Sequence, residues 1–427
     1  MSNTYFPLSK EELEKLARHF PTPFYLYDEK GIVKNVRRIK AAFSSLPGYK
    51  QHFAVKALPN PYILKVLAAE GIGADCSSRP ELMLAEMAGI SGEDIMFTSN
   101  ETPAKEYELA RQLGAVINLD DISHIEFLEK TAGFPQLISL RYNPGPLKEG
   151  NAIIGKPEEA KYGLTREQII RGFAPLKEKG VRRFALHAMV ASNELSVPYH
   201  VETARMLFEL AAEVRDKADV QLEFINLGGG VGIPYKPDQK AVDYDELAKG
   251  IQKAYNDILK PSGLEPGIRT EWGRTITGPY GWLVARAIHK KEIYRNYIGL
   301  DACMADLMRP ALYGAYHHIS IPGKENAPSN KVYDIVGSLC ENNDKFAVQR
   351  SLPKITVEAQ SPDNKGDFVV IHDAGAHGRA MGFNYNGKLR CGEILLRQNG
   401  TTVMIRRPET VEDYFATLDI AGLKKFS

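Results

Sequence analysis

Hydrophobic positions up to about residue 280 alternate between short apolar runs and runs with helical spacing. Residues 31–43 show the helical spacing, because Ile32, Val36 and Ile39 fall on one face of a helix. Similar helices are expected at 61–71, 79–88, 103–113, 122–131 and 201–215. The short apolar runs predict strands at 24–27, 73–76, 95–98, 115–118, 137–141, 184–189 and 222–227. Strands that alternate with helices form βαβ units, and roughly eight such units predict a (β/α)8 TIM-like barrel of the α/β class.

The pattern changes after residue 280, where helical spacing fades and β-rich runs follow one another. These runs lie at 281–289, 297–300, 331–336, 367–372, 393–396 and 402–406. They predict a C-terminal domain that is mostly antiparallel and β-barrel-like. The N-terminal segment precedes the barrel and is expected to join that domain, with Ser9 and Glu12 as a capping box at the start of its helix. We therefore expect a barrel domain over residues 28–280 and a β-rich domain over residues 1–27 and 281–427.

The composition excludes several classes of protein. With 427 residues, 44% hydrophobic and 25% charged, the chain is typical of a soluble globular protein with two domains. The formal net charge of +1 argues against nucleic acid or an anionic membrane as partner, and no apolar run reaches membrane-spanning length. The four cysteines form no CxxC pair, which argues against a zinc site and against a disulfide framework. We expect no metal site, no signal peptide and a reducing cytoplasm as the location.

The stretch His52-Phe53-Ala54-Val55-Lys56-Ala57 predicts a short buried strand that ends in a lysine. Apolar neighbours make a charged ammonium costly, so Lys56 either reaches solvent at the strand end or acts as a neutral amine. A neutral amine is what a Schiff base with an aldehyde cofactor requires. By itself, a solvated lysine at the end of a strand is the simpler interpretation.

Two further motifs follow predicted strands late in the barrel. Gly228, Gly229 and Gly230 come directly after a strand, and consecutive glycines let backbone N–H groups approach a phosphate. Such glycines fit a flexible turn equally well. Glu271 and Arg274 come at the end of the next strand, where a carboxylate can keep a pyridine nitrogen protonated and an arginine can bind phosphate or carboxylate. By themselves, these two residues fit a surface ion pair better.

Charged and reactive side chains also occur together in the β-rich part. Arg309 and Tyr313 are four positions apart, and Cys340 stands next to Glu341 before a turn-like Asn-Asn-Asp. Residues 373–378 form a glycine-dense loop with His at position 377, and a tyrosine follows at position 385 within an Asn-Tyr-Asn string. A lone cysteine is by default a buried structural residue, so each of these features is weak by itself.

The order and spacing of these strings resemble the diaminopimelate decarboxylases, which belong to the pyridoxal-phosphate decarboxylases with an alanine-racemase-like barrel. Similar strings run from residue 21 to residue 416, and they are FAVKA, RYNPG, LGGGVGIPY, an EPGR-like string, RPALY, a Cys-Glu pair and the Asn-Tyr-Asn tail. The combination is highly specific to that group. The resemblance implies pyridoxal 5'-phosphate as cofactor and the decarboxylation of meso-2,6-diaminopimelate to L-lysine and carbon dioxide.

The resemblance also implies roles around the cofactor. Lys56 would carry the cofactor as a Schiff base, and Ser192 with the glycines at 228–230 would hold its phosphate. Glu271 would pair with the pyridinium nitrogen, and Arg274 would lie beside the cofactor.

At the substrate, the resemblance assigns the distal carboxylate to Arg274, Arg309 and Tyr313, and the distal amine to Glu341. Cys340 would protonate the carbanion that remains when carbon dioxide departs. In this family the Cys-Glu loop is given across a dimer interface, so the β-rich domain would complete the active site of an obligate homodimer with shared sites.

The chain departs from the family pattern at several positions. Met189 stands where the family has a histidine that stacks on the cofactor ring, and Trp272 replaces the proline of the EPGR-like string. His377 replaces a tyrosine that touches phosphate and substrate, so His377 and Tyr385 are both candidates for that role. The string after Ser192 is also off the usual pattern.

Three other functions stay open from the residues. A sister decarboxylase could act on carboxynorspermidine, ornithine or arginine, but ornithine and arginine lack the distal carboxylate that Arg274 and Arg309 would bind. A catalytically dead binding protein is expected to lack the lysine or the cysteine, and both Lys56 and Cys340 are present. A racemase on the same barrel needs a second acid–base group, normally a tyrosine, and a narrow site for a small amino acid.

Overall fold

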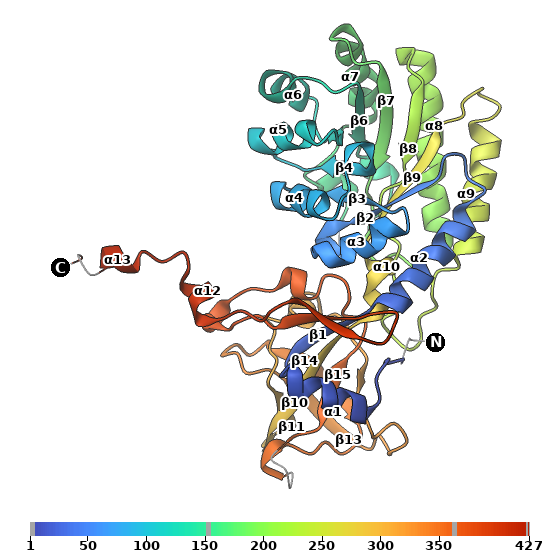
Figure 1. Cartoon of the computed structure of the whole chain (residues 1–427). Helices are drawn as coiled ribbons and strands as arrows, with labels where there is room; N and C mark the ends of the chain where they lie inside the picture. Colours follow the sequence, from blue (N-terminus) through green and yellow to red (C-terminus); the bar gives the residue numbers. More distant parts are fainter. Residues whose placement is uncertain (1–4, 151–154, 361–364, 424–425, 427) are drawn as a thin grey trace. The chain divides into compact units, whose positions relative to one another are not determined.

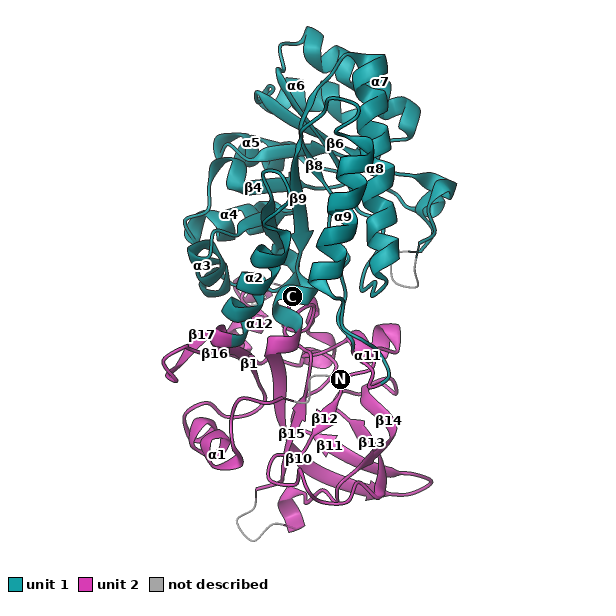
Figure 2. Ribbon diagram, turned by 90° about the vertical axis from the view of Figure 1, so that its right-hand side faces the viewer, with its two compact units in different colours: residues 1, 31–234, 238–278 teal, residues 2–30, 235–237, 279–427 magenta. Residues whose placement is uncertain are grey.

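The computed structural model describes residues 5–150, 155–360, 365–423 and 426. The chain divides into two compact units (Figures 1 and 2). One unit contains residues 31–234 and 238–278, and the other contains residues 2–30, 235–237 and 279–427. The second unit is discontinuous in sequence, because the first unit is inserted between its N-terminal part and the rest of it.

The first unit is a closed barrel of eight parallel strands with helices around it (Figure 1). The strands, in order around the barrel, are β2 (Lys50–Ala54), β3 (Gly73–Cys76), β4 (Ile95–Thr98), β5 (Val116–Leu119), β6 (Leu137–Tyr142), β7 (Arg183–Ala188), β8 (Leu222–Asn226) and β9 (Gly267–Trp272). The helices are α2 (Glu29–Phe43), α3 (Pro61–Ala69), α4 (Arg79–Met87), α5 (Ala104–Gln112), α6 (His124–Ala132), α7 (Arg166–Glu178), α8 (Val197–Ala218), α9 (Tyr244–Ile258) and α10 (Arg274–Thr277). The predicted (β/α)8 barrel is confirmed.

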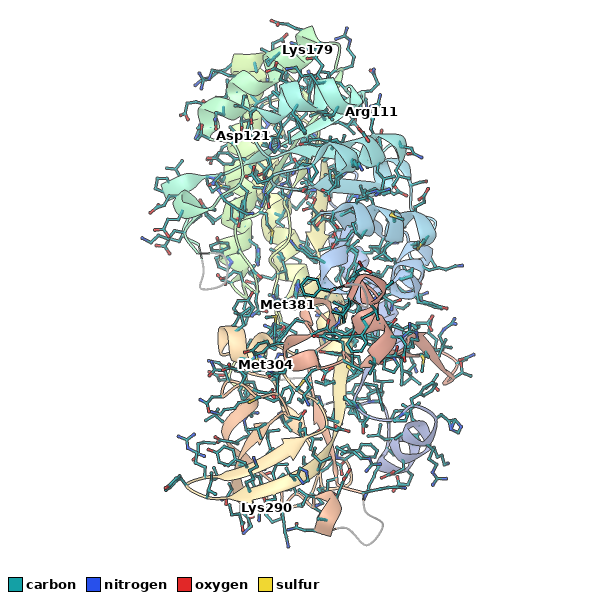
Figure 3. The ribbon with its side chains drawn as sticks, turned by 90° about the vertical axis from the view of Figure 1, so that its left-hand side faces the viewer. Arg111, Asp121, Lys179, Lys290, Met304 and Met381 are labelled. Carbon is teal, nitrogen blue, oxygen red and sulfur yellow. The ribbon has the colours of Figure 1, made fainter. Side chains whose placement is uncertain are left out.

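The strands of the barrel are buried almost throughout, which explains why they read as continuous apolar runs. Five neighbouring strands contribute one buried cluster, formed by Met96, Val116, Leu137, Ala185 and Phe224. Several helices begin at a polar cap that accepts a backbone N–H; these caps are Asn60, Ser78, Thr165, Ser196 and Asp243. Charged side chains such as Arg111 and Lys179 lie on the exposed side of the helical layer (Figure 3).

The second unit is built on one nine-stranded sheet, and the prediction of a mostly antiparallel β-rich domain is confirmed. Its strands are β1 (Phe24–Asp28), β10 (Gly281–Glu292), β11 (Asn296–Leu300), β12 (Ile319–Ser320), β13 (Lys331–Val336), β14 (Lys345–Leu352), β15 (Phe368–Ile371), β16 (Gly392–Leu396) and β17 (Thr402–Arg406). The order along the main path is β14-β13-β11-β10-β1-β16-β17, and β15 pairs with both β10 and β12.

Strand β1 lies between the long strand β10, to which it is antiparallel, and β16, to which it is parallel. The helix α1 (Lys10–His19) opens on the predicted capping box of Ser9 and Glu12, which is confirmed. Its Leu13 and Leu16 pack into a buried cluster that includes Trp282 of β10. The remaining helices of this unit are α11 (Arg309–Tyr313), α12 (Val411–Phe415) and α13 (Ile420–Leu423).

Some local predictions differ from the structure. The strand expected to end at the lysine ends at Ala54, and the 3-10 turn Val55–Ala57 follows it. Helix α7 was not predicted, since Gly172 and Pro175 interrupt its helical pattern. Strand β14 was also not predicted, since its buried and exposed positions do not alternate regularly. Within the described residues, no helix is both long enough and apolar enough to cross a membrane.

Candidate active site

Lys56 lies in the 3-10 turn that directly follows β2, at the carboxyl end of this barrel strand. Its neighbours Val55 and Ala57 are buried, whereas Lys56 itself is exposed. The sequence left open whether Lys56 reaches solvent or is enclosed by its apolar neighbours. In the structure it reaches solvent at the end of the strand. Barrel enzymes carry their active sites on this face, where the loops after the strands meet.

Two buried carboxyl groups, Asp75 of β3 and Glu271 of β9, have opposite environments. Burial raises the pKa of Asp75 well above its ordinary value, the charge of Glu271 raises it further, and the charge of Lys56 lowers it. Burial also acts to raise the pKa of Glu271, but the charge and hydrogen bond of His187, the charge of His52 and the hydrogen bond of Asn226 together outweigh it, so this pKa lies below its ordinary value. One environment favours a neutral carboxyl and the other an ionised carboxylate, a separation typical of catalytic sites.

Both oxygens of Glu271 have hydrogen-bond partners on neighbouring strands. The Nδ2 of Asn226 donates to Oε1 over 2.7 Å, and the Nε2 of His187 lies 2.8 Å from Oε2. His187 and Asn226 are paired in the register of β7 and β8, so the sheet itself brings them together. Sequence reasoning missed Asp75, His187 and Asn226 as site residues. The available signal was a polar side chain inside an otherwise apolar strand run.

The glycine loop lies too close to neighbouring backbone to accept side chains. Gly228 and Gly230 have positive φ angles of 69° and 98°, which favour glycine. A Cβ atom built on Gly228 would lie 2.0 Å from the carbonyl oxygen of Ala188, and one on Gly229 would lie 2.5 Å from that of Glu271. The loop therefore presents backbone without side chains, and such backbone is what a phosphate can approach closely. Together with Lys56 and an ionised Glu271, it fits a pyridine cofactor that carries an aldehyde and a phosphate.

Side chains next to this loop come from the segments after β7 and β9. The Nη2 of Arg274, which begins α10, donates to Oγ of Ser192 over 3.3 Å, so two predicted cofactor residues lie together. The backbone N–H of Gly229 points at the sulfur of Met189, at 3.2 Å.

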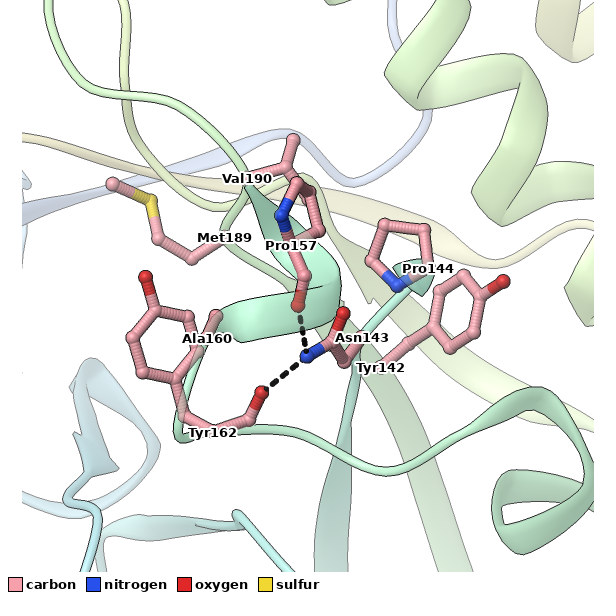
Figure 4. Close-up of a pocket in the computed structure, with 8 residues that line it drawn as sticks. All are labelled: Tyr142, Asn143, Pro144, Pro157, Ala160, Tyr162, Met189 and Val190. Atoms are coloured by element: carbon pink, nitrogen blue, oxygen red, sulfur yellow. Dashed lines mark hydrogen bonds between the residues drawn. The ribbon is translucent and has the colours of Figure 1, made fainter. Parts of the chain in front are cut away.

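Met189 also lines a small pocket (Figure 4). In that pocket the Nδ2 of Asn143 donates to the carbonyl oxygens of Pro157 and Tyr162, and these two hydrogen bonds join the end of β6 to the segment at 157–162. The guanidinium of Arg141, from the RYNPG string, covers the ring of Tyr162 at 3.9 Å.

In the second unit, Arg309 and Tyr313 stand at opposite ends of the short helix α11. Arg309 is only 3% exposed, whereas Tyr313 is 49% exposed. The Nη1 of Arg309 lies 2.8 Å from Nε2 of His317, and its guanidinium carbon lies 4.5 Å from the centre of the Tyr235 ring. Arg309 is thus a buried cation with aromatic neighbours.

The Cys-Glu loop and the Asn-Tyr-Asn string are joined in this unit. The backbone N–H of Cys340 donates to Oδ1 of Asn386 over 3.1 Å, and Cys340, Glu341 and Tyr385 are all exposed. The carboxylate of Asp344 closes the loop by accepting the N–H of Leu339 over 2.8 Å. Cys340 is therefore not the buried structural residue that a lone cysteine usually is.

His377 is partly buried and has a positive φ of 54°, in the loop that begins with Asp373. The other three cysteines, Cys76, Cys303 and Cys391, are buried, and all four are free. Among the described residues, no group of three His, Cys, Asp or Glu could hold a metal ion.

A (β/α)8 barrel with a side-chain-free glycine loop and a buried carboxylate at its strand ends is typical of the class of barrel enzymes that use a phosphate-bearing aldehyde cofactor. The family model of the pyridoxal binding domain of pyridoxal-dependent decarboxylases matches residues 30–278. The chain belongs to this family of pyridoxal-dependent decarboxylases.

Three relatives illustrate the similarity. Protein TabA of Pseudomonas amygdali pv. tabaci is 42% identical over 96% of this chain and 93% of its own. A diaminopimelate decarboxylase of Methanothermobacter thermautotrophicus is 34% identical over 93% of this chain and 92% of its own. The crystal structure of diaminopimelate decarboxylase from M. jannaschii with L-lysine has a TM-score of 0.88 and 28% identity, and covers 98% of this chain and 99% of that one. The predicted resemblance, the pyridoxal cofactor and the decarboxylase class are confirmed.

Proposed function

We propose that the protein decarboxylates meso-2,6-diaminopimelate to L-lysine and carbon dioxide with pyridoxal 5'-phosphate as cofactor, as a step of lysine biosynthesis. The observation that carries the proposal is the buried Glu271, whose environment favours the carboxylate, at the end of a barrel strand. A carboxylate there can keep a pyridine nitrogen protonated, which decarboxylation of an amino acid requires. The relatives named diaminopimelate decarboxylase, one of them solved with L-lysine, support the choice of substrate.

The barrel residues would hold the cofactor. Lys56 is the amine for its aldehyde, the backbone of residues 228–230 with Ser192 binds its phosphate, and Arg274 supports Ser192. Glu271 holds the proton at the ring nitrogen, and His187 and Asn226 fix the direction of the Glu271 carboxylate. The bound cofactor supplies an electron-poor ring that accepts the electron pair left when carbon dioxide departs.

The substrate has an ammonium and a carboxylate at its far end, and the proposal gives each a partner of opposite charge. Arg274, Arg309 and Tyr313 bind the distal carboxylate, and Glu341 binds the distal ammonium. A substrate without that carboxylate, such as ornithine, would make no charge-assisted hydrogen bond with these guanidinium groups, which costs affinity.

Cys340 would deliver the proton that replaces carbon dioxide at the α-carbon. Its exposure and its backbone hydrogen bond to Asn386 support this role, because a proton donor must reach the substrate from a fixed position. Tyr385 and His377 are the two candidates for a further contact to phosphate and substrate. Apart from Arg274, the proposed substrate-binding and proton-donating groups belong to the β-rich unit.

We also propose that the enzyme is a homodimer with shared active sites and that it works in the cytoplasm. Four free cysteines, one of them exposed, support a reducing compartment.

The test is to incubate the purified, cofactor-loaded protein with meso-diaminopimelate and to measure lysine and carbon dioxide. We expect one lysine and one carbon dioxide for each molecule consumed. Lys56→Ala abolishes the reaction, and Lys65→Ala, which changes an exposed lysine on the next helix, leaves it unchanged. Borohydride reduction and peptide mapping are expected to find the cofactor on Lys56. Cofactor on another lysine would contradict the lysine assignment, and loaded protein without lysine formation would contradict the substrate.

A further inference from the structure

Arg309 is a buried cation, and its guanidinium needs neighbours that fix its direction. The imidazole of His317 is one of them, with Nε2 at 2.8 Å from Nη1 of Arg309. His317 is itself fully buried, at 0% exposure, and lies eight residues beyond Arg309, after the end of α11. The chain turns between α11 and β12, and this turn brings the two side chains together.

The hydrogen bonds determine which nitrogen of His317 carries the proton. Its Nδ1 lies 2.7 Å from the backbone carbonyl oxygen of His372, and a carbonyl oxygen can only accept. The Nδ1 therefore carries the proton. An arginine N–H can only donate, so Nε2 is the unprotonated acceptor. His317 is thus a neutral imidazole whose two nitrogens are both engaged, one with the backbone and one with Arg309.

The surroundings of His317 keep this ring in place. Strand β12 follows it and pairs with β15, so that the ring lies against the residue that supplies the carbonyl, His372. The Nη1 of Arg350 donates to the carbonyl oxygen of His317 over 3.0 Å, and the Tyr235 ring meets the imidazole edge-on at 5.2 Å. The same Tyr235 ring faces the guanidinium of Arg309, so both partners share one aromatic neighbour.

The chemistry of the acceptor matters for a carboxylate-binding site. A neutral imidazole takes one N–H of the guanidinium and adds no negative charge, so the cation keeps its attraction for an anion. An aspartate or glutamate at the same position would hold Arg309 equally well but would neutralise it.

We propose that His317 is a positioning residue that orients the guanidinium of Arg309 toward the distal carboxylate of the substrate. This inference rests on the proposed function, in which Arg309 binds that carboxylate. His317 touches neither substrate nor cofactor in this role, and it acts through the direction in which Arg309 presents its N–H groups.

Two substitutions separate positioning from folding. His317→Gln can place its side-chain oxygen near the Nε2 position and keeps an acceptor for Arg309. His317→Asn is shorter and can keep the donor to the carbonyl of His372, but it cannot reach Arg309. We expect His317→Asn to raise the KM for meso-diaminopimelate at least about tenfold, with kcat within about threefold and cofactor content unchanged. His317→Gln is expected to stay within about threefold of the wild-type KM. In an Arg309→Lys background, His317→Asn should raise the KM little further, because the contact between Arg309 and His317 is already lost.

A spectroscopic measurement tests the geometry without substitution. In wild-type protein with 15N-labelled histidine rings, at pH 7, the His317 signal should show a neutral ring with the proton on Nδ1. A proton on Nε2, or a charged ring, would overturn the proposal even if the variants do not fold. If the wild-type enzyme makes lysine but the Asn and Gln variants have equal KM values, the positioning role of His317 is overturned and the proposed function is not. If the cofactor-loaded wild-type enzyme makes no lysine, both the proposed function and the proposed binding of the distal carboxylate by Arg309 are overturned.

Discussion

At the scale of single residues, the barrel holds two carboxyl groups that differ through their partners. Glu271 accepts hydrogen bonds from His187 and Asn226, whereas Oδ1 of Asp75 has no hydrogen-bond partner among the described residues. Both side chains are about equally buried, so burial alone does not separate them. The hydrogen-bond partners separate the two pKa values, because a carboxylate that accepts hydrogen bonds from a histidine and an amide is stabilised in its ionised form.

Asp373 in the β-rich unit shows the same principle with a consequence for stability. Its Oδ2 is buried and has no hydrogen-bond partner among the described residues. Burial raises its pKa from 3.8 to about 7, although the charge of Arg309 lowers it. Between about pH 4 and pH 7 the folded state therefore binds more protons here than the unfolded state, so stability falls as the pH rises through this window.

Asp373→Asn removes this ionisable group, and we expect the variant to lose less stability than the wild type between pH 5 and pH 8. Over this interval the difference is at most about 3 kcal/mol, because roughly two pKa units of the shift lie between pH 5 and pH 7 and one unit is about 1.4 kcal/mol. Urea unfolding midpoints at the two pH values measure the effect, and the exposed Asp419→Asn serves as control. Parallel pH profiles for Asp373→Asn and wild type would show that Asp373 titrates normally in the folded protein.

At the scale of elements, the loop after β8 combines positive φ angles with close approach of neighbouring backbone. Both properties exclude side chains, but for different reasons, and a pair of glycines separates them. Gly230 and Gly180 have φ angles of 98° and 92°. A Cβ atom on Gly230 would lie 2.7 Å from the carbonyl oxygen of Ala191, whereas one on Gly180 would meet nothing within 4 Å.

Gly230→Ala is therefore expected to lower cofactor affinity at least about tenfold, because the loop must shift to accept the methyl group. Gly180→Ala carries the same backbone strain of about 1 kcal/mol and should lower the melting temperature without changing cofactor affinity. Cofactor titrations followed by absorbance, together with thermal unfolding, distinguish the two. If both variants bind the cofactor as the wild type does, the loop does not form the phosphate site.

Local pattern was enough to predict most elements, since apolar runs and helical spacing are properties of neighbouring residues. It was not enough for the partners of Glu271. His187 and Asn226 lie 84 and 45 residues away in sequence and meet Glu271 only because β7, β8 and β9 are neighbours in the closed barrel. The lysine, the glycine loop and the Cys-Glu pair could be proposed from the sequence, because each lies in a contiguous string. His317 was missed, because its role depends on a carbonyl group 55 residues further along the chain.

At the scale of the whole molecule, the proposed homodimer makes a prediction about mixed subunits. If Cys340 of one chain serves the site that contains Lys56 of the other, a dimer of one Lys56→Ala chain and one Cys340→Ala chain has one intact site. Random exchange makes about half of the dimers mixed, so about a quarter of wild-type activity should appear when two inactive variants are mixed. The control is each variant mixed with itself. No activity after exchange, confirmed by mass spectrometry of the mixed dimers, would contradict shared sites.

The position of β1 in its sheet has a consequence for the order of folding. The Tyr27 hydroxyl donates to Glu393, a residue 366 positions further along the chain, and β1 pairs with β10 and β16 on its two sides. During synthesis, the barrel strands β2 to β9 emerge as one uninterrupted segment and can pair as soon as the last of them is made. Strand β1 emerges before all of them and can pair with β10 only after the barrel strands have been made, and its other neighbour, β16, emerges later still. We therefore expect the barrel to fold first and the β-rich unit to complete last, with β1 held by chaperones or left in solvent in the meantime.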